Sequence, residues 1–362
     1  MVKENTERPL DYYSARDLFK QFSDSSQQQQ SVSVRRSHGR QTKMIANNSV
    51  ALTNITEHSS CDKSLETAFR ALNLIVGFIT LTGNLLVFAA IVTTPRLRQN
   101  PMNQFLASLA VTDIFMGACV TPGYSLFCIG CLEYPLSKYC WLMEGTKDIA
   151  LASSIYNLLA ISLDRCLAVY WPLRYPNLMT KRKVILILSL VWGLSLAIAL
   201  IRNFWIHTTT GAEYDAINSR YNNFLLIFVL LIPCITVSVI NVKIMLTIRK
   251  QALQVMALRQ SHAHNAIQAD DPDENQAELA RKRRGTVACA LIVIVFVVSW
   301  IPRVSFNIQY AISGDVGEVN ALLHKISIFF FIVQSSINPV IYSFFRGDFR
   351  QAAVKLLRCK NN

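Results

Sequence analysis

Seven stretches of mostly apolar residues follow one another along the chain, separated by polar connections. Lipid offers no partners to backbone N–H and C=O groups, so an apolar stretch of about 20 residues is predicted to cross a bilayer as a helix. The third stretch is the least apolar, because Glu144, Lys147 and Asp148 lie near its start. The seven predicted helices are Leu72–Val92, Phe105–Cys128, Leu142–Val169, Val184–Ile201, Phe224–Ile248, Val287–Ile312 and Ile326–Phe345.

The composition agrees with a membrane protein. The 362-residue chain is 52% hydrophobic and only 16% charged, with a mean hydropathy of +0.29, whereas a soluble domain carries about a quarter charged residues. We therefore predict an all-α membrane protein built as a seven-transmembrane helix bundle. The helix number is odd and no repeat is visible, which disfavours a transporter made of inverted halves.

Lysine and arginine gather in alternate connections between the spans. Examples are the run Lys181–Lys183 and the run Arg281–Arg284, whereas the opposite connections hold few cations. Because basic loops stay in the cytoplasm, this asymmetry predicts a multi-pass plasma-membrane protein with an extracellular N-terminus. It also accounts for most of the net charge of +13, so no nucleic-acid partner is expected.

Three regions follow from these patterns. Residues 1–68 are polar and lack a signal-peptide pattern, so they are predicted to form a disordered extracellular tail, with glycosylation sequons at Asn47 and Asn54. Residues 69–345 form the seven-transmembrane domain, in which the connection at about Arg249–Arg284 reads as a polar linker. Residues 346–362 form the C-terminal region, an amphipathic helix and tail that the charge asymmetry predicts to lie in the cytoplasm.

Polar residues inside the spans are costly and therefore suggest function. Asn84, Asp113 and Asn338 are such residues, and they either join helices together or form a cluster whose hydrogen bonds differ between two helix arrangements. Asp164 precedes Arg165 at the inner end of the third span. That carboxylate is expected to hold the arginine against its own helix until a partner takes it; the alternative is a border arginine that obeys the positive-inside rule.

Prolines lie inside three of the predicted helices, at Pro233, Pro302 and Pro339. A proline removes one backbone hydrogen bond and weakens a turn. Pro302 follows Trp300 at a distance of two residues, so a rotation of that ring is expected to swing the cytoplasmic half of its helix.

Taken together and in order, these motifs closely resemble those of the rhodopsin-like (class A) G-protein-coupled receptors. Within that family the sequence is most similar to the aminergic and adenosine-like members. The resemblance covers about Leu72 to Cys359. The motifs that carry it are Gly83–Val87, Leu109–Asp113, Asp164–Cys166, Trp192, Pro233, Phe296–Pro302 and Asn338–Tyr342.

The resemblance implies roles for individual residues. Asp113, Ser154, Ser335 and Asn338 would form a pocket for an allosteric sodium ion, although Gln334 stands where asparagine is frequent. The activation switch would comprise Asp164, Arg165, Ile155, Pro233, Phe296, Trp300, Pro302, Pro339 and Tyr342. Arg165, Pro172 and Leu173 would dock a heterotrimeric G protein. Arrestin, a receptor kinase and membrane lipid are further implied partners.

The resemblance also implies an amphipathic eighth helix along the membrane after Phe345, with Cys359 as a palmitoylation site. Cys140 matches the outer cysteine of the third helix, but no cysteine stands between Cys166 and Cys234. Its disulfide partner is therefore open, with Cys61, Cys128 and Cys131 as candidates.

Departures from the family pattern predict raised signalling without ligand. Lys282 stands where an acidic residue often pairs with Arg165, and Asn241 replaces a usual tyrosine. We expect a hydrogen bond between the Thr286 hydroxyl and Arg165, with the guanidinium as donor, to offset part of this effect.

The expected ligand is a small molecule or a peptide. Lys147 occupies the position of the amine-binding carboxylate, and Arg303 follows Pro302, so an anionic ligand is one hypothesis. The alternative is that neither cation binds ligand: Lys147 pairs with Glu144 or Asp148, and Arg303 reaches the lipid headgroups. An amine remains open if Asp148 faces inward. The expected ligand site comprises Lys147, Asp148, Leu151, Leu226, Trp300, Arg303, Val304, Asn307 and Ile328.

Other functional classes fit the sequence less well. A seven-helix transporter or channel needs a continuous polar path, but the spans are apolar around Asp113. A light sensor needs a lysine in the seventh helix where Ile332 stands. No catalytic constellation or metal-ligand spacing is present, so we expect neither an enzyme nor a cofactor, apart from the sodium ion.

Overall fold

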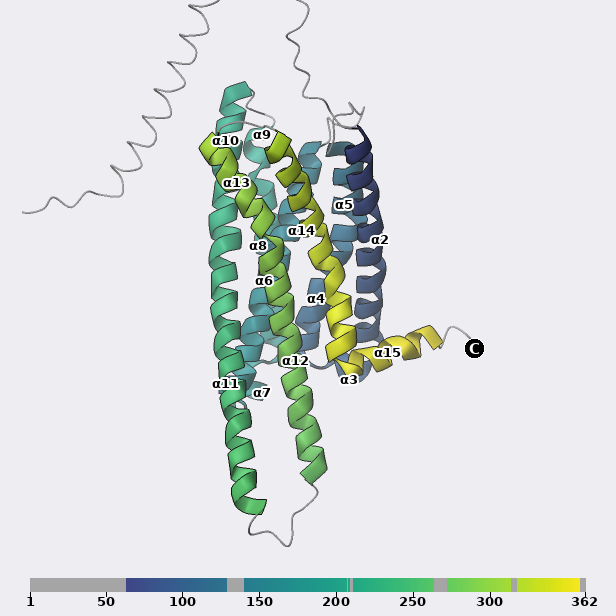
Figure 1. Ribbon diagram of the computed structural model, residues 1–362, viewed down its shortest axis with the longest axis vertical. Helices are drawn as coiled ribbons and strands as arrows, with labels where there is room; N and C mark the ends of the chain where they lie inside the picture. Colours follow the sequence, from purple (N-terminus) through teal and green to yellow (C-terminus); the bar gives the residue numbers. More distant parts are fainter. Residues whose placement is uncertain are drawn as a thin grey trace, which may run out of the picture. The chain divides into compact units, whose positions relative to one another are not determined.

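The computed structural model describes residues 63–128, 140–206, 208, 211–263, 272–313 and 318–358. Within these residues the chain forms helices joined by short turns (Figure 1). The helices are α2 (Lys63–Thr93), α3 (Pro95–Arg98), α4 (Pro101–Phe115), α5 (Thr121–Gly123), α6 (Cys140–Tyr170), α7 (Tyr175–Leu178), α8 (Lys181–Ile201), α9 (Asn203–Ile206), α10 (Gly211–Phe224), α11 (Ile232–Ala263), α12 (Pro272–Ser299), α13 (Ile301–Ser313), α14 (Glu318–Phe345) and α15 (Gly347–Arg358). Three π-helical segments, η1 (Met116–Val120), η2 (Tyr124–Cys128) and η4 (Leu225–Leu231), connect some of them.

The predicted seven-helix bundle is confirmed. Six of the predicted spans lie in helices long and apolar enough to cross a membrane: Lys63–Thr93, Pro101–Leu126, Lys181–Trp205, Ala216–Gln251, Thr286–Gln309 and Leu322–Phe345. The third predicted span lies in α6, which is 31 residues long but carries Glu144, Lys147 and Asp148 in its first turns. Those charges lower the hydropathy of α6 without breaking the helix.

Two predicted boundaries are wrong. Helix α2 begins at Lys63, whereas the predicted tail ran to residue 68. Helix α11 continues to Ala263 and α12 begins at Pro272, although a polar linker was predicted from about Arg249 to Arg284. These extensions are rich in alanine, leucine, glutamine, glutamate, lysine and arginine, which favour helix without any need for an apolar environment.

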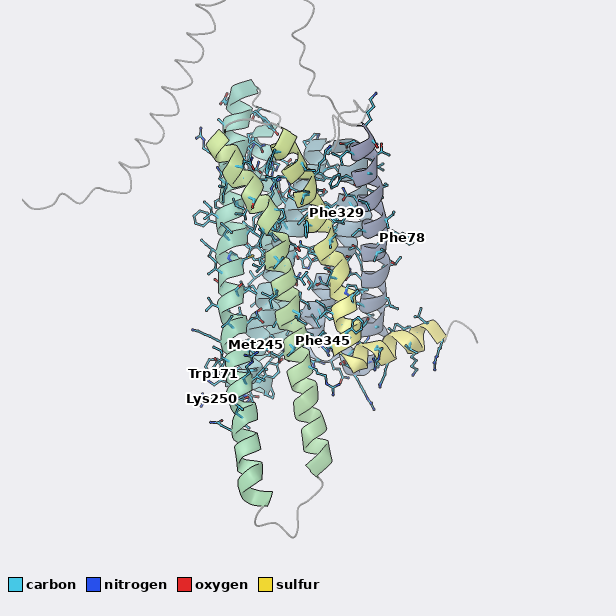
Figure 2. The ribbon with its side chains drawn as sticks, in the orientation of Figure 1. Phe78, Trp171, Met245, Lys250, Phe329 and Phe345 are labelled. Carbon is cyan, nitrogen blue, oxygen red and sulfur yellow. The ribbon has the colours of Figure 1, made fainter. Side chains whose placement is uncertain are left out.

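The helices pack so that the first and seventh spans are neighbours. Helix α2 contacts α4 and α14, α6 contacts α4, α8 and α11, and α12 contacts α11 and α14. Large apolar side chains that face away from this core are exposed, such as Phe78 at 67% and Ile185 at 62%, and Figure 2 shows Phe78 on the outer side of α2. Exposed apolar surface of this extent is what lipid covers in a membrane protein.

Helix α15 marks one end of the bundle, here called the α15 end; the opposite end, where α10 begins, is called the α10 end (Figure 1). Trp171 and Lys250 lie toward the α15 end (Figure 2). Phe349 and Ala352 of α15 are buried, whereas Arg350 and Lys355 are exposed. One face of α15 is therefore buried and the other exposed, and its place along a membrane as an eighth helix stays a prediction.

Two of the three predicted weak points interrupt their helices. Helix α12 ends at Ser299 and α13 begins at Ile301, which leaves Trp300 in a turn just before Pro302. The π-helical segment η4 precedes Pro233. Pro339, by contrast, lies inside the continuous helix α14. The helix changes at two of the predicted prolines and continues unbroken through the third.

Candidate functional site

The buried polar residues of the apolar spans form a central polar cluster. Asn338 Nδ2 donates to Asp113 Oδ2 at 2.7 Å and joins α14 to α4, while Asn84 Nδ2 donates to the carbonyl of Ser335 at 3.0 Å and joins α2 to α14. A cavity with room for about one water molecule lies beside them, lined by Leu109, Ser154, Leu158, Ile292, Phe296, Gln334, Ser335 and Asn338. The four residues predicted for the sodium pocket therefore lie together.

Among the described residues, three buried oxygen atoms of this cluster lack a hydrogen-bond partner. Asp113 Oδ1, Asn84 Oδ1 and Gln334 Oε1 are buried and have no hydrogen-bond partner in the described part of the chain. A buried acceptor without a partner is costly, and carboxylate and amide oxygens suit hard cations. The donor set fits a sodium ion, and Gln334 supplies an oxygen as an asparagine would.

Trp300 sits in the turn between α12 and α13, among aromatic rings. Its ring centroid lies 6.1 Å from that of Phe296 and 5.3 Å from that of Phe331 on α14. Ile155, Phe296 and Pro233 are all buried, on α6, α12 and α11 respectively. A rotation of the Trp300 ring must therefore disturb contacts on both α12 and α14.

At the α15 end, Asp164 holds Arg165 against their own helix, as predicted. Arg165 Nη2 lies 2.5 Å from Asp164 Oδ2, and the other carboxylate oxygen accepts a hydrogen bond from the Tyr175 hydroxyl at 2.7 Å. Burial, together with the charge of Asp164, raises the pKa of Tyr175, so this hydroxyl stays protonated and remains a donor. The Arg165 guanidinium is available to a partner only when this network opens.

The loop after α6 presents the two residues predicted to dock a partner. Pro172 is exposed and Leu173 is 94% exposed. A side chain so exposed beyond the end of a span is accessible to a protein partner.

Tyr342 connects the seventh span to α15. Its ring stacks on that of Phe349 with centroids 5.6 Å apart. Arg346 lies between the two helices, where it pairs with Asp348 at 2.6 Å and donates to Asn103 on α4 at 3.0 Å. These contacts attach α15 both to α14 and to the start of α4.

A second buried ion pair lies at the α10 end. Arg202, just after α8, binds Asp148 of α6 with Nη2 2.8 Å from Oδ2, and the two side chains are 2% and 1% exposed. Its remaining donors reach Asn218 at 2.6 Å and Asn222 at 3.1 Å, one turn apart on α10. Asp148 is therefore held toward α8 and α10, not presented as an open carboxylate.

Lys147 points to other partners, although it adjoins Asp148 in sequence. Its ammonium donates to Glu144 Oε2 and lies 5.5 Å from the centroid of the Tyr124 ring, while the Tyr124 hydroxyl donates to Glu144 Oε1. The pairing with Glu144 agrees with the alternative in which Lys147 forms an ion pair within the receptor and does not bind an anionic ligand. Arg303 stacks on Phe306, its guanidinium 5.3 Å from the ring centroid, within electrostatic range of Glu144 and Asp148.

The other predicted ligand residues are distributed around this region. Leu151 is buried, whereas Leu226, Val304, Asn307 and Ile328 are partly buried. We call Tyr124, Glu144, Lys147, Asp148, Arg202 and Arg303 the charge cluster of the α10 end. Three cations and two carboxylates give this cluster a net positive charge.

Sequence reasoning missed Arg202 and Tyr124 as members of this cluster. In the sequence, Arg202 is one of the few cations in the connections that are poor in lysine and arginine. Tyr124 belongs to a predicted apolar span. The available signal was the pair Asn218 and Asn222, since amides spaced by four residues lie on one helix face and suit a buried arginine.

Some predicted features lie outside the described residues. These are the sequons at Asn47 and Asn54, the Cys359 palmitoylation site, and the side chains of Cys140 and Lys282. Cys128 is disulfide-bonded, and Cys119, Cys166, Cys234 and Cys289 are free. The bridge predicted for Cys140 stays a prediction.

The sequence of this chain is similar to those of known proteins. The family model described as 7 transmembrane receptor (rhodopsin family) matches residues 83–342. The chain belongs to the rhodopsin family of seven-transmembrane receptors. Among its relatives are the histamine H2 receptor of Homo sapiens, 27% identical over 87% of this chain and 85% of that protein, and the D(5)-like dopamine receptor of Takifugu rubripes, 29% identical over 77% and 64%.

Membership of the rhodopsin family makes this chain a multi-pass membrane protein and a G-protein-coupled receptor, not an enzyme. The histamine and dopamine receptors among its relatives place it beside the aminergic members of the family. The D(1B) dopamine receptor of Rattus norvegicus is another such relative, 27% identical over 78% of this chain and 68% of that protein.

Proposed function

We propose that this receptor lies in the plasma membrane with its N-terminus outside, binds a small amine at the α10 end, and activates a heterotrimeric G protein at the α15 end. The observation that carries the proposal is the arrangement of one polar cluster at each end, with a third between them. The charge cluster lies at the α10 end, the central polar cluster at mid-bundle, and the Asp164–Arg165 pair at the α15 end.

The orientation is supported by charge. The exposed cations Arg96, Arg98, Lys181, Arg182, Lys183, Arg249, Lys250, Arg350 and Lys355 belong to connections or helix ends at the α15 end. Basic residues near the ends of spans stay in the cytoplasm. The α15 end is accordingly the cytoplasmic end, where the G protein, arrestin, a receptor kinase and anionic lipid would meet Arg165, Leu173 and α15.

Signalling by this receptor is a shift between two populations of helix arrangement. A ligand favours the open arrangement only through contacts that are better in that arrangement, typically by about 1–3 kcal/mol. The Trp300 turn and the Asp164–Arg165 pair are the parts that differ between the two arrangements. A sodium ion at Asp113, Ser154, Ser335 and Asn338 would supply positive charge to the central polar cluster and favour the closed arrangement.

An amine is the ligand that the relatives' names suggest, and two carboxylates are present to receive it. Asp148 is buried against Arg202, whereas the Glu144 side chain is 29% exposed. Glu144 is therefore the acid that an incoming ammonium meets, and Asp148 contributes only if the Arg202 pair opens.

A ligand with an acidic group is the second candidate, favoured by Arg303. Among the described residues, its contact is the Phe306 ring, with no carboxylate at ion-pair distance. An Arg303 guanidinium without an acid partner, in a cluster of net positive charge, attracts a carboxylate or phosphate.

A ligand panel on purified receptor in nanodiscs tests the proposal. Monoamines, carboxylic acids and amino acids are each added with a heterotrimeric G protein, and GTPγS uptake is measured for wild type, Glu144→Gln, Arg303→Gln and Arg165→Ala. We expect amine responses lost in Glu144→Gln and all uptake lost in Arg165→Ala. Acid responses lost only in Arg303→Gln would replace the amine by the second candidate, and uptake that is unchanged in Arg165→Ala would contradict the proposal.

A further inference from the structure

Glu144 has three partners at the α10 end. Arg202 Nη2 lies 3.8 Å from Glu144 Oε2, and two other groups donate hydrogen bonds to its oxygens. The Tyr124 hydroxyl, from η2, donates to one carboxylate oxygen, and the Lys147 ammonium, from the next turn of α6, donates to the other. A pair three residues apart on a helix surface is by itself weakly stabilising. Here the tyrosine of a second helix fixes the carboxylate in place.

The same tyrosine also faces the ammonium. Lys147 Nζ lies 5.5 Å from the centroid of the Tyr124 ring, within the range at which an aromatic face attracts a cation. A carboxylate that accepts a charge-assisted hydrogen bond, together with an aromatic ring against the same cation, is a site that recognises an ammonium group. One ammonium already occupies it, and this ammonium belongs to the receptor.

The occupied site is accessible and its occupant can move away. The Lys147 and Glu144 side chains are 23% and 29% exposed, and a lysine ends in a flexible four-carbon stem. Asp148, on the same helix, is held by Arg202 and is 1% exposed. Of the two carboxylates, Glu144 is therefore the one for which Lys147 and an external amine compete.

We propose that Glu144 and Tyr124 form a binding site for a primary ammonium group, which Lys147 fills as a tethered competitor of the ligand. This inference deepens the proposed function, because it rests on an amine as the ligand and names the subsite that receives the amine. A tethered group acts at an effective concentration on the millimolar scale. A free amine must therefore bind with other parts of its structure as well in order to displace Lys147.

Replacing the lysine by a free amine of the same shape tests the site. Lys147→Ala removes the tethered ammonium together with three of the four side-chain carbons, and n-butylammonium supplies an alkylammonium as long as the whole lysine side chain as a separate molecule. The readout is the melting temperature of purified receptor in nanodiscs, which rises when a ligand binds the folded state. We expect a saturable rise in Lys147→Ala at millimolar n-butylammonium, at least threefold larger than in wild type, and no rise in Lys147→Ala combined with Glu144→Gln.

Matched controls separate the site from general effects of charge. Lys63→Ala removes an exposed lysine at the same end of the bundle, and n-butanol supplies the shape without the charge; neither should reproduce the rise. Lys147→Gln serves if the alanine variant does not fold. A rise that is equal in wild type, or that survives Glu144→Gln, or that is absent from both Lys147 variants overturns the inference.

A second readout distinguishes this inference from the proposed function. GTPγS uptake by the G protein is measured on the same samples. A thermal rise without any uptake, in the variants and in wild type, supports the ammonium site and contradicts the proposed signalling. Normal uptake without a thermal rise supports signalling and contradicts the site.

Discussion

Asn241 on α11 donates a hydrogen bond to the hydroxyl of Ser162 on α6, with 2.8 Å between the nitrogen and oxygen atoms. Both side chains are buried. Closer to the α15 end, the hydroxyls of Tyr170 and Thr247 meet at 3.0 Å and join the same two helices. The family pattern has a tyrosine at position 241; in this chain the shorter asparagine joins the fifth span to the third.

The first prediction concerns this connection. Ser162→Ala leaves the Asn241 amide without a partner on α6, and we expect basal GTPγS uptake to rise about fivefold, the equivalent of one hydrogen bond of about 1 kcal/mol. Thr236→Ala is the matched control, because Thr236 is exposed on α11 and, among the described residues, its hydroxyl bonds to the carbonyl of Ile232 in its own helix. An equal rise in both variants, or none in Ser162→Ala, would show that the connection does not restrain α11.

The second prediction concerns Lys282, where the family pattern has an acidic residue. Lys282→Glu introduces a carboxylate that can pair with Arg165 and favour the closed arrangement, so basal uptake should fall below that of wild type. Arg284→Glu makes the same charge change at an exposed position of α12 and should leave uptake nearly unchanged. Wild-type uptake equal to that of empty nanodiscs would contradict the expected basal activity.

The third prediction concerns the Arg202–Asp148 pair. No cysteine lies between Cys166 and Cys234, so no disulfide can attach α8 or α10 to α6, and the buried pair makes that connection. Removing one partner of a buried ion pair costs about 3–5 kcal/mol. Arg202→Gln and Asp148→Asn should each lower the melting temperature strongly, and the double variant should lose no more than the worse single variant.

Arg220→Gln is the control for that cycle, since Arg220 is exposed on α10. Additive losses in the double variant would mean that the two side chains do not act as a pair.

The fourth prediction concerns the central polar cluster. If Asp113 and its neighbours hold sodium, the melting temperature of wild type should be higher in sodium chloride than in choline chloride at equal ionic strength. Asp113→Asn removes the charge and should abolish the difference, whereas Ser343→Ala, at an exposed position of α14, should keep it. A wild-type receptor that is insensitive to the choice of cation would argue against a bound ion.

Much of the fold was predictable because a bilayer imposes a simple rule on the chain. Apolar length decides where a helix crosses, so the seven spans were found, including α6 with its three charges. The boundaries at Lys63 and Ala263 were missed because helices continue into water by their own propensity, which apolar length does not report.

The site was predictable in part, for a different reason. Asp113 and Asn338 were expected together because each is polar in an apolar span, and Asp164 and Arg165 because they are adjacent. The pairing of Asp148 with Arg202 depends on how α6, α8 and α10 approach one another. That approach is a tertiary relationship, and no local pattern around either residue encodes it.

Helix α2 meets η1 and the start of α5, in the second span, at glycines. A Cβ atom on Gly117 would lie 2.7 Å from the carbonyl oxygen of Gly77, and one on Gly77 would lie 2.6 Å from Thr121 Cγ2. Backbones in such direct contact cannot slide or tilt past one another without a clash. The first two spans therefore serve as the stationary frame of the receptor, and any signal must be transmitted by helices that swing relative to that frame.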